Sequence, residues 1–191
     1  DTANTAILWS IRLPMTLTCV FVGGSLSLAG LQIQTITNNA LASPYTLGIT
    51  ASASFGAAIA ITLGLSVAGY LWIGTALLAL VFALAVSLLI FYLGRLKGMS
   101  TSTLILSGII MNFFFQALQQ YLQYRASPEI AQIISGWTFG NLQRSSWIST
   151  GVSSTCWTIV LLISFCYSWK LTALSDGTER ARGLGILSLI H

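Results

Sequence analysis

The chain has 191 residues, a length that would suit one soluble domain. Charged residues make up only 6% of it, against roughly 25% in ordinary globular proteins, and hydrophobic residues make up 55%. No charged side chain occurs from Leu13 to Gly94, a run of 82 residues that is long enough for about three membrane-spanning helices. The composition therefore predicts an all-α, polytopic transmembrane helical bundle. It excludes a soluble domain, a disordered chain, a secreted disulfide scaffold and a nucleic-acid-binding domain.

Prolines, polar runs and charges divide the apolar pattern into five predicted spans. In chain order these cover residues 14–34, 45–64, 71–93, 103–124 and 147–169. Pro14 suits the first turn of the first span, and Ser43 with Pro44 suits the N-cap and first turn of the second. The second span has small residues at four-residue spacing, which lets helix backbones approach closely. These are Ser52, Gly56, Ala60 and Gly64.

Two short helices are predicted outside the spans. The first covers residues 128–136, with Ser127 as a possible cap, Pro128 in the first turn and Gly136 at its end. Its large apolar residues repeat at helical spacing, which indicates a helix lying at the membrane interface. They are Ile130, Ile133, Ile134 and Trp137.

The second short helix covers residues 176–184 in the charged tail. Asp176 can cap its start and Glu179 can complete a capping box. Either a docking element for a soluble partner or a solvated linker is consistent with these features.

The distribution of basic residues predicts the orientation of the chain. If the chain crosses the membrane five times, one side of the membrane carries Arg95, Lys97, Lys170, Arg180 and Arg182. The other side carries Arg12, Arg125 and Arg144. The side with five basic residues is expected to be cytoplasmic. This places the first residue outside the cell, so we expect a fragment with at least one span before Asp1 and another beginning beyond His191.

The fourth predicted span has a polar stripe. At 100° per residue, one side of the helix gathers Thr101, Gly108, Asn112, Gln116, Gln119, Gln120 and Gln123. Amides in a membrane must face protein or water, because an unpaired amide in hydrocarbon costs several kcal/mol. The stripe therefore indicates either the wall of a polar passage or hydrogen bonds between helices, and the number of amides favours the passage.

Several kinds of chemistry have no counterpart in the sequence. There is no GxxxxGK[ST] phosphate-binding loop, no HExxH motif and no acidic residue inside a predicted span. Cys19, Cys156 and Cys166 all lie in apolar stretches and are interpreted as packing residues. No cofactor and no metal site are predicted.

Several stretches resemble the permease subunits of bacterial ABC importers for iron–siderophore, haem and cobalamin, the FecCD type. The matching segments, in order along the chain, are Arg12-Leu13-Pro14, Leu28-Ala29-Gly30-Leu31-Gln32, Asn39-Ala40-Leu41-Ala42-Ser43-Pro44, Ser100-Thr101-Ser102, Trp137-Thr138-Phe139-Gly140 with Trp147, and Gly177-Thr178-Glu179-Arg180-Ala181-Arg182-Gly183-Leu184-Gly185. Each motif alone is short, but their shared order over almost the whole chain is specific.

The resemblance implies the large-fold, type II permease architecture in the bacterial cytoplasmic membrane. Such permeases have about ten spans, of which this chain would cover the second to the sixth. The implied partners are an ATP-binding cassette ATPase that hydrolyses ATP on a separate chain, a solute-binding protein, a second identical or related permease subunit and the lipid bilayer.

The resemblance also implies roles for individual residues. Arg12 would dock the solute-binding protein, although Met15 replaces the second arginine of the family motif. The cytoplasmic gate would include Asn39, Leu41, Thr101 and Ser102. Contact with the ATPase would fall to Gly177, Glu179, Ala181, Arg182, Leu184 and Gly185. The translocation pathway would include Asn112, Gln116, Gln119 and Gln123.

The favoured hypothesis is therefore a permease subunit of an ATP-driven importer for an iron–siderophore or related metal chelate. An ion-gradient-driven carrier or channel is the alternative, and it would need intramembrane acids or an ion site. A membrane-embedded enzyme is a third hypothesis, but it would need a catalytic constellation inside the spans.

Overall fold

The computed structural model describes residues 2–96 and 100–175, and within these ranges it consists of helices without strands. The elements are α1 (Thr2–Ile7), a π-helical turn η1 (Leu8–Arg12), α2 (Leu13–Thr37), α3 (Ile49–Thr62), α4 (Leu71–Gly94), α5 (Thr101–Arg125), α6 (Pro128–Phe139), a 3₁₀ turn η2 (Leu142–Arg144) and α7 (Trp147–Ser175). The all-α fold expected from composition is thus confirmed. The helix predicted at 176–184 lies outside the described residues.

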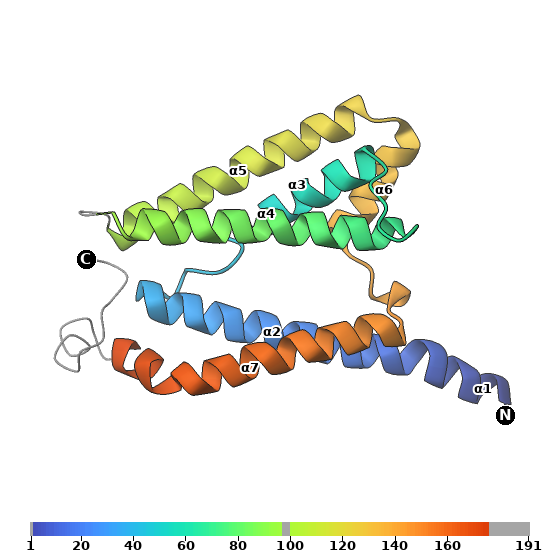
Figure 1. Cartoon of the computed structure of the whole chain (residues 1–191), viewed down its shortest axis with the longest axis horizontal. Helices are drawn as coiled ribbons and strands as arrows, with labels where there is room; N and C mark the ends of the chain where they lie inside the picture. Colours follow the sequence, from blue (N-terminus) through green and yellow to red (C-terminus); the bar gives the residue numbers. More distant parts are fainter. Residues whose placement is uncertain (1, 97–99, 176–191) are drawn as a thin grey trace.

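The helices form two groups that are visible in Figure 1. The long helices α2 and α7 lie side by side, and α3, α4, α5 and α6 form the second group. Helix α3 is the centre of the second group because it packs against α4, α5 and α6. A small apolar core in this group is formed by Leu47, which precedes α3, by Val86 and Ile90 of α4, and by Leu104 of α5. Ile33 of α2 packs against this core.

Among the described helices, four are long and apolar enough to cross a membrane. They are Asn4–Thr37, Leu71–Gly94, Ser102–Arg125 and Trp147–Ala173. The molecule is therefore a multi-pass membrane protein. The C-terminal ends of α4 and α7 lie at one end of the molecule, and the N-terminus, the end of α5 and the start of α7 lie at the other (Figure 1).

The sequence pattern predicts that Pro14 begins the first long helix. The structure differs, because Arg12 is already helical, with φ and ψ of −71° and −45°. The proline ring is accommodated by the preceding π turn, in which the Leu13 N–H bonds to the Leu8 carbonyl five residues back. This wider turn gives the ring room that a regular α-helix would deny it. Thr150 of α7 adds a contact, with its Oγ1 at 3.1 Å from the Pro14 carbonyl oxygen.

The second predicted span is shorter than expected, since α3 covers 14 residues rather than the whole of 45–64. Ser43 and Pro44 do begin a turn, and the Ser43 hydroxyl accepts a hydrogen bond from the Thr46 N–H at 3.1 Å. Gly48 then adopts a left-handed conformation, with φ of 74°, and the regular helix starts at Ile49. The far end stops at Thr62 because Gly64 is also left-handed, with φ of 63°.

Small residues bring α3 against α4. Ser52 and Ala60 are completely buried, and a Cβ on Gly56 would lie 2.7 Å from the Leu78 carbonyl oxygen. The predicted ridge is therefore a packing surface over its first three positions. Its fourth member, Gly64, is exposed and lies beyond the helix end.

Helix α6 extends past the predicted end at Gly136 and stops at Phe139, where Gly140 has φ of 73°. A glycine inside a helix does not end it unless the backbone turns left-handed there, and Gly136 stays helical. The apolar stripe of this helix is divided. Ile134 is 1% exposed and packs with Ala58 and Ile61 of α3, whereas Ile133 is 49% exposed.

The start of α6 is held by a local carboxylate. Hydrogen bonds from the Glu129 backbone N–H and from the Ser127 hydroxyl hold the pKa of Glu129 below its usual value of 4.5. The carboxylate therefore stays charged at neutral pH, and its negative charge interacts favourably with the positive, N-terminal end of the helix dipole.

Hydroxyl groups of α7 are satisfied mainly within their own helix. Thr155 and Thr158 donate to backbone carbonyls four residues back, at 2.8 Å each, and Ser154 donates three residues back. Two hydroxyls also bond to α2. Thr150 Oγ1 lies 2.8 Å from Thr18 Oγ1, and Gln32 of α2 donates to Ser164, while both hydroxyls also bond to carbonyls four residues back. Trp9, in the η1 turn before α2, packs against Trp147 at the start of α7, with ring centroids 5.5 Å apart and the rings tilted by 44°.

Candidate functional site

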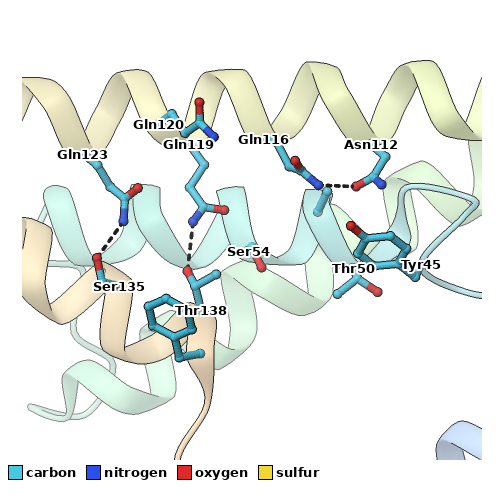
Figure 2. A pocket seen from close by; sticks show the side chains of 12 residues that line it. Tyr45, Thr50, Ser54, Asn112, Gln116, Gln119, Gln120, Gln123, Ser135 and Thr138 are labelled. Atoms are coloured by element: carbon cyan, nitrogen blue, oxygen red, sulfur yellow. Dashed lines mark hydrogen bonds between the residues drawn. The ribbon is translucent and has the colours of Figure 1, made fainter.

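A cavity of about 410 Å³ lies between α3, α5 and α6 (Figure 2). Its walls combine amides, hydroxyl groups and two aromatic rings. The lining residues are Tyr45, Thr50, Ala51, Ser54, Asn112, Gln116, Gln119, Gln120, Gln123, Ser135, Thr138 and Phe139. All twelve are described, and none of them is charged.

The α5 wall consists of the five amides that the sequence places on one helix face. Asn112 and Gln119 are buried, with 6% and 7% of their surface exposed, and Gln120 is exposed. Gln116 and Gln123 are intermediate. Thus every predicted pathway residue lies on this wall.

Three hydrogen bonds fix the amides in place (Figure 2). Gln116 Nε2 donates to Asn112 Oδ1 at 3.0 Å within α5. Gln119 Nε2 donates to Thr138 Oγ1 at 2.9 Å, and Gln123 Nε2 donates to Ser135 Oγ at 3.1 Å, which ties α5 to α6. Interhelical bonding and cavity lining, which are alternatives on the sequence alone, are therefore combined on one helix face.

The cavity can offer both donors and acceptors to a ligand. The glutamine oxygens of Gln119 and Gln123 receive no hydrogen bond from the described residues, and neither is buried without a partner. Gln120 makes no hydrogen bond to a described residue and adds a complete amide. Such a wall can bind many polar groups weakly, but it supplies no charge for holding an ion.

Backbone contact positions α5 beside the turn that precedes α3. A Cβ on Gly108 would lie 2.6 Å from Leu47 Cα and 2.7 Å from the Thr46 carbonyl oxygen. Only a glycine permits this approach, which places Asn112, one turn further along α5, against the turn that contains Tyr45. Gly108 was grouped with the polar stripe in the sequence, but its role is close packing.

The four predicted gate residues lie on two separate segments. Asn39 Oδ1 accepts a hydrogen bond from the Leu41 N–H at 2.8 Å, which shapes the turn after α2, and the Leu41 side chain is 81% exposed. Thr101 and Ser102 open α5, next to the helix cap formed by Ser100. Within the described residues, no hydrogen bond joins the first pair to the second.

The predicted partner contacts fall at opposite ends of the chain. Arg12 ends the π turn, is exposed and forms no ion pair with a described residue. The predicted ATPase contacts at Gly177, Glu179, Ala181, Arg182, Leu184 and Gly185 lie outside the described residues.

Sequence reasoning missed the side of the cavity opposite α5. Thr50 and Ser54 line it from α3, and Ser135 and Thr138 line it from α6. Their spacing of four and of three residues is a signal for a shared helix face, but the sequence does not reveal that these faces meet the glutamines.

The FecCD transport family matches residues 1–188 of this sequence. The chain belongs to this family. FecCD relatives include the "probable iron chelatin transport system permease protein" of Helicobacter pylori, which is 32% identical over 94% of this chain and 53% of the relative. The molybdate import system permease protein MolB of Haemophilus influenzae is 30% identical over 97% of this chain and 54% of the relative.

A third FecCD relative is the vitamin B12 import system permease protein BtuC of Salmonella paratyphi A, which is 30% identical over 93% of this chain and 53% of the relative. Among solved structures, a metal-chelate type ABC transporter in an inward-facing conformation matches with a TM-score of 0.85 and 29% identity. That match covers 97% of this chain and 58% of the other. The type II ABC permease fold is thus confirmed, and the chain spans about half the length of these FecCD relatives.

Proposed function

We propose that this chain is part of the membrane permease of an ATP-driven importer that carries an iron–siderophore or related metal chelate into the bacterial cytoplasm. Membership of the FecCD family supports the class of transporter. The observation that supports a chelate as cargo is the uncharged, amide-lined cavity between α3, α5 and α6. A chelator surrounds its metal and presents polar groups to the wall, so binding needs hydrogen bonds rather than counter-charges.

Weak binding suits a carrier. A buried charge opposite an ionic cargo would hold it tightly, because electrostatic attraction is strong where water is excluded. Amides and hydroxyls exchange partners at small net cost, about 0.5–1.5 kcal/mol for each bond. A cargo can therefore be bound on one side and released on the other as the helices alternate between two arrangements.

The proposed assembly has partners on both sides of the membrane. In it, the end of the molecule that contains Arg95 and Lys170 faces the cytoplasm, and an ATP-binding cassette ATPase contacts the segment around Glu179 and Arg182. Arg12, at the other end, contacts a solute-binding protein, and a second permease subunit completes the pathway. Asn39, Leu41, Thr101 and Ser102 form the cytoplasmic gate.

The test is transport by the full-length parent permease, assembled with its ATPase in liposomes. We expect uptake of a radio-iron-labelled ferric siderophore to require hydrolysable ATP and to persist when an ionophore removes the membrane potential. Uptake that survives ATP depletion but stops with the ionophore would instead support an ion-gradient-driven carrier.

A further inference from the structure

The segment between α2 and α3 (residues 38–48, the connecting segment) is not helical, but hydrogen bonds fix its shape. Gln34 Nε2, in the last turn of α2, donates to the Ala40 carbonyl oxygen at 3.0 Å. Further along, the Ser43 N–H donates to Thr46 Oγ1 at 2.8 Å, and the Thr46 N–H donates to Ser43 Oγ at 3.1 Å. Reciprocal bonds of this kind hold a turn in one conformation. The connecting segment is therefore a rigid piece and not a loose loop.

The far end of the connecting segment is packed onto α5. Ala42 is completely buried, and Leu47, which is 4% exposed, shares an apolar core with Leu104 of α5. A Cβ on Gly48 would lie 3.0 Å from the Asn112 backbone nitrogen, so the two backbones are in contact without a side chain between them. All of these contacts are made inside the chain, and they hold whatever covers its exposed surfaces.

The connecting segment joins the proposed gate to the amide cavity. Figure 1 shows it crossing from the end of α2 to the group formed by α3, α4 and α5. Asn39 and Leu41 lie near its start, and its end contacts the turn of α5 that contains Asn112, whose side chain lines the cavity. The other two proposed gate residues, Thr101 and Ser102, begin α5 itself. Both parts of the gate are therefore attached to the helix that forms the cavity wall.

We propose that the contact between Gly48 and Gly108 is a positioning contact for transport, which makes the connecting segment and α5 move as one body. The gate turn at Asn39 and Leu41 then follows the amide wall when the helices change arrangement. Closely packed backbones transmit a shift, because no flexible side chain between them can absorb it. A gate that moved separately from the wall would no longer tie ATP hydrolysis to release of the cargo. The inference rests on the proposed function, which supplies the gate.

The chain offers a matched pair of glycines for the test. Gly48→Ala places a methyl group against α5 and also strains the backbone, since φ is 74° at this position. Gly69→Ala, in the loop before α4, brings the same left-handed strain at φ of 79°, but its methyl group meets nothing within 4 Å. Gly108→Ala adds a methyl group from the α5 side of the contact, and Gly23→Ala is its helical control with open space around the Cβ.

Two measurements are made on the full-length permease with its ATPase. Spin labels at Ala40→Cys and Phe113→Cys, two exposed positions in a background without native cysteines, report the distance between the connecting segment and α5 in nanodiscs. This distance is compared between the nucleotide-free and the vanadate-trapped states. In liposomes, uptake of a radio-iron-labelled ferric hydroxamate is divided by the ATP hydrolysed, a ratio that a uniform loss of folded protein does not change.

We expect the parent, Gly69→Ala and Gly23→Ala to give one narrow label distance that is the same in both states. In Gly48→Ala and Gly108→Ala the distance should broaden or differ between the states, and uptake per ATP should fall about fivefold, within the range that overpacking gives. The control variants should keep this ratio within about twofold of the parent.

A label distance that changes between the two states in the parent would overturn the inference without any variant. An uptake-to-hydrolysis ratio in Gly48→Ala and Gly108→Ala equal to that of their controls would also overturn it, while ATP-driven import stands. If the parent shows no ATP-dependent uptake, the proposed function fails and the gating role fails with it, but the label distances still decide whether the connecting segment moves with α5.

Discussion

Gly48 and Gly108 lie in backbone contact, so that a Cβ on Gly48 would stand 2.9 Å from the Gly108 carbonyl oxygen. This contact joins the turn before α3 to the middle of α5, the helix whose amides line the cavity. Because both partners are backbone, no side-chain rotation can relieve an added atom. The cavity wall and the turn therefore keep a fixed separation.

The Gly108→Ala substitution tests this close approach. Its methyl group would lie 2.6 Å from Leu47 Cα, so the helices must move apart. We expect a loss of about 1–3 kcal/mol in stability, the usual cost of overpacking, measured by reversible unfolding in lipid. Gly23→Ala is the control, since a Cβ there meets nothing within 4 Å, and it should be neutral or slightly stabilising.

The bond between Gln119 and Thr138 should show a measurable coupling. In a double-mutant cycle with Gln119→Leu and Thr138→Val, we expect an interaction energy of about 0.6–1.7 kcal/mol, as found for polar pairs between membrane helices. Unfolding in bicelles gives the four stabilities. Ser154→Ala, which removes a bond within α7, serves as the unlinked control. A coupling near zero would mean that the bond between Gln119 and Thr138 does not help to hold α6 against α5.

A charge in the cavity should hinder transport of a neutral chelate. Gln116→Glu keeps the side-chain shape but adds a carboxylate to a wall without cations, where it must be hydrated or protonated. We expect the initial rate of ferric hydroxamate uptake to fall about tenfold, equivalent to about 1.4 kcal/mol. Gln143→Glu, on the exposed turn η2, adds the same charge outside the cavity and should transport normally. Equal rates for the two variants would argue against passage beside α5.

The Glu179 and Arg182 side chains are proposed to couple the permease to its ATPase. Replacing both by alanine should leave ATP hydrolysis measurable and abolish most uptake, because the force from the ATPase no longer reaches the spans. Both activities are measured on the same liposomes. Arg180→Ala removes a neighbouring charge that is not in the predicted contact set. Full transport by the double variant would contradict the coupling role.

Glu129 gives a pH dependence with a defined sign. Its pKa is lower in the folded protein than its usual 4.5, so its ionised form contributes stability above pH 4.5 that is lost as the pH falls through the folded-state pKa. The protection of the amides at the start of α6, taken as their exchange rate relative to the unstructured chain at the same pH, should therefore fall in acid in the parent. In Glu129→Gln the protection of the same amides should not depend on this titration. If the protection of these amides had the same pH profile in both proteins, Glu129 would not be the cause of the pH dependence.

The fold class and the amide row followed from local patterns in the sequence. Uncharged apolar runs indicate helices in lipid, so the range predicted as 71–93 is close to the observed Leu71–Gly94. The common face of Asn112, Gln116 and Gln119 follows from helix periodicity alone. These features depend on residues within one helix, and helix geometry is uniform enough to be read from spacing.

Two kinds of feature were missed: a local change of helix type, and contacts between helices. Pro14 was expected to begin a helix, but the π turn before it permits helix on both sides. Gly48 shortens α3 through a left-handed turn that packs on α5, and the identity of Ser135 and Thr138 as amide partners depends on the path of the chain between α5 and α6. Single-residue patterns do not contain this information.

The hydroxyl groups of α7 have a consequence for biogenesis. Counted by residue type, Ser and Thr make this helix look less suited to lipid than α4. Thr155 and Thr158, however, donate hydrogen bonds to carbonyls of their own helix. Placing them in the membrane therefore leaves no unpaired donor in hydrocarbon. The helix thus needs no partner to satisfy these groups. It can enter the bilayer as an independent unit and associate with α2 afterwards, through Thr150 and Ser164.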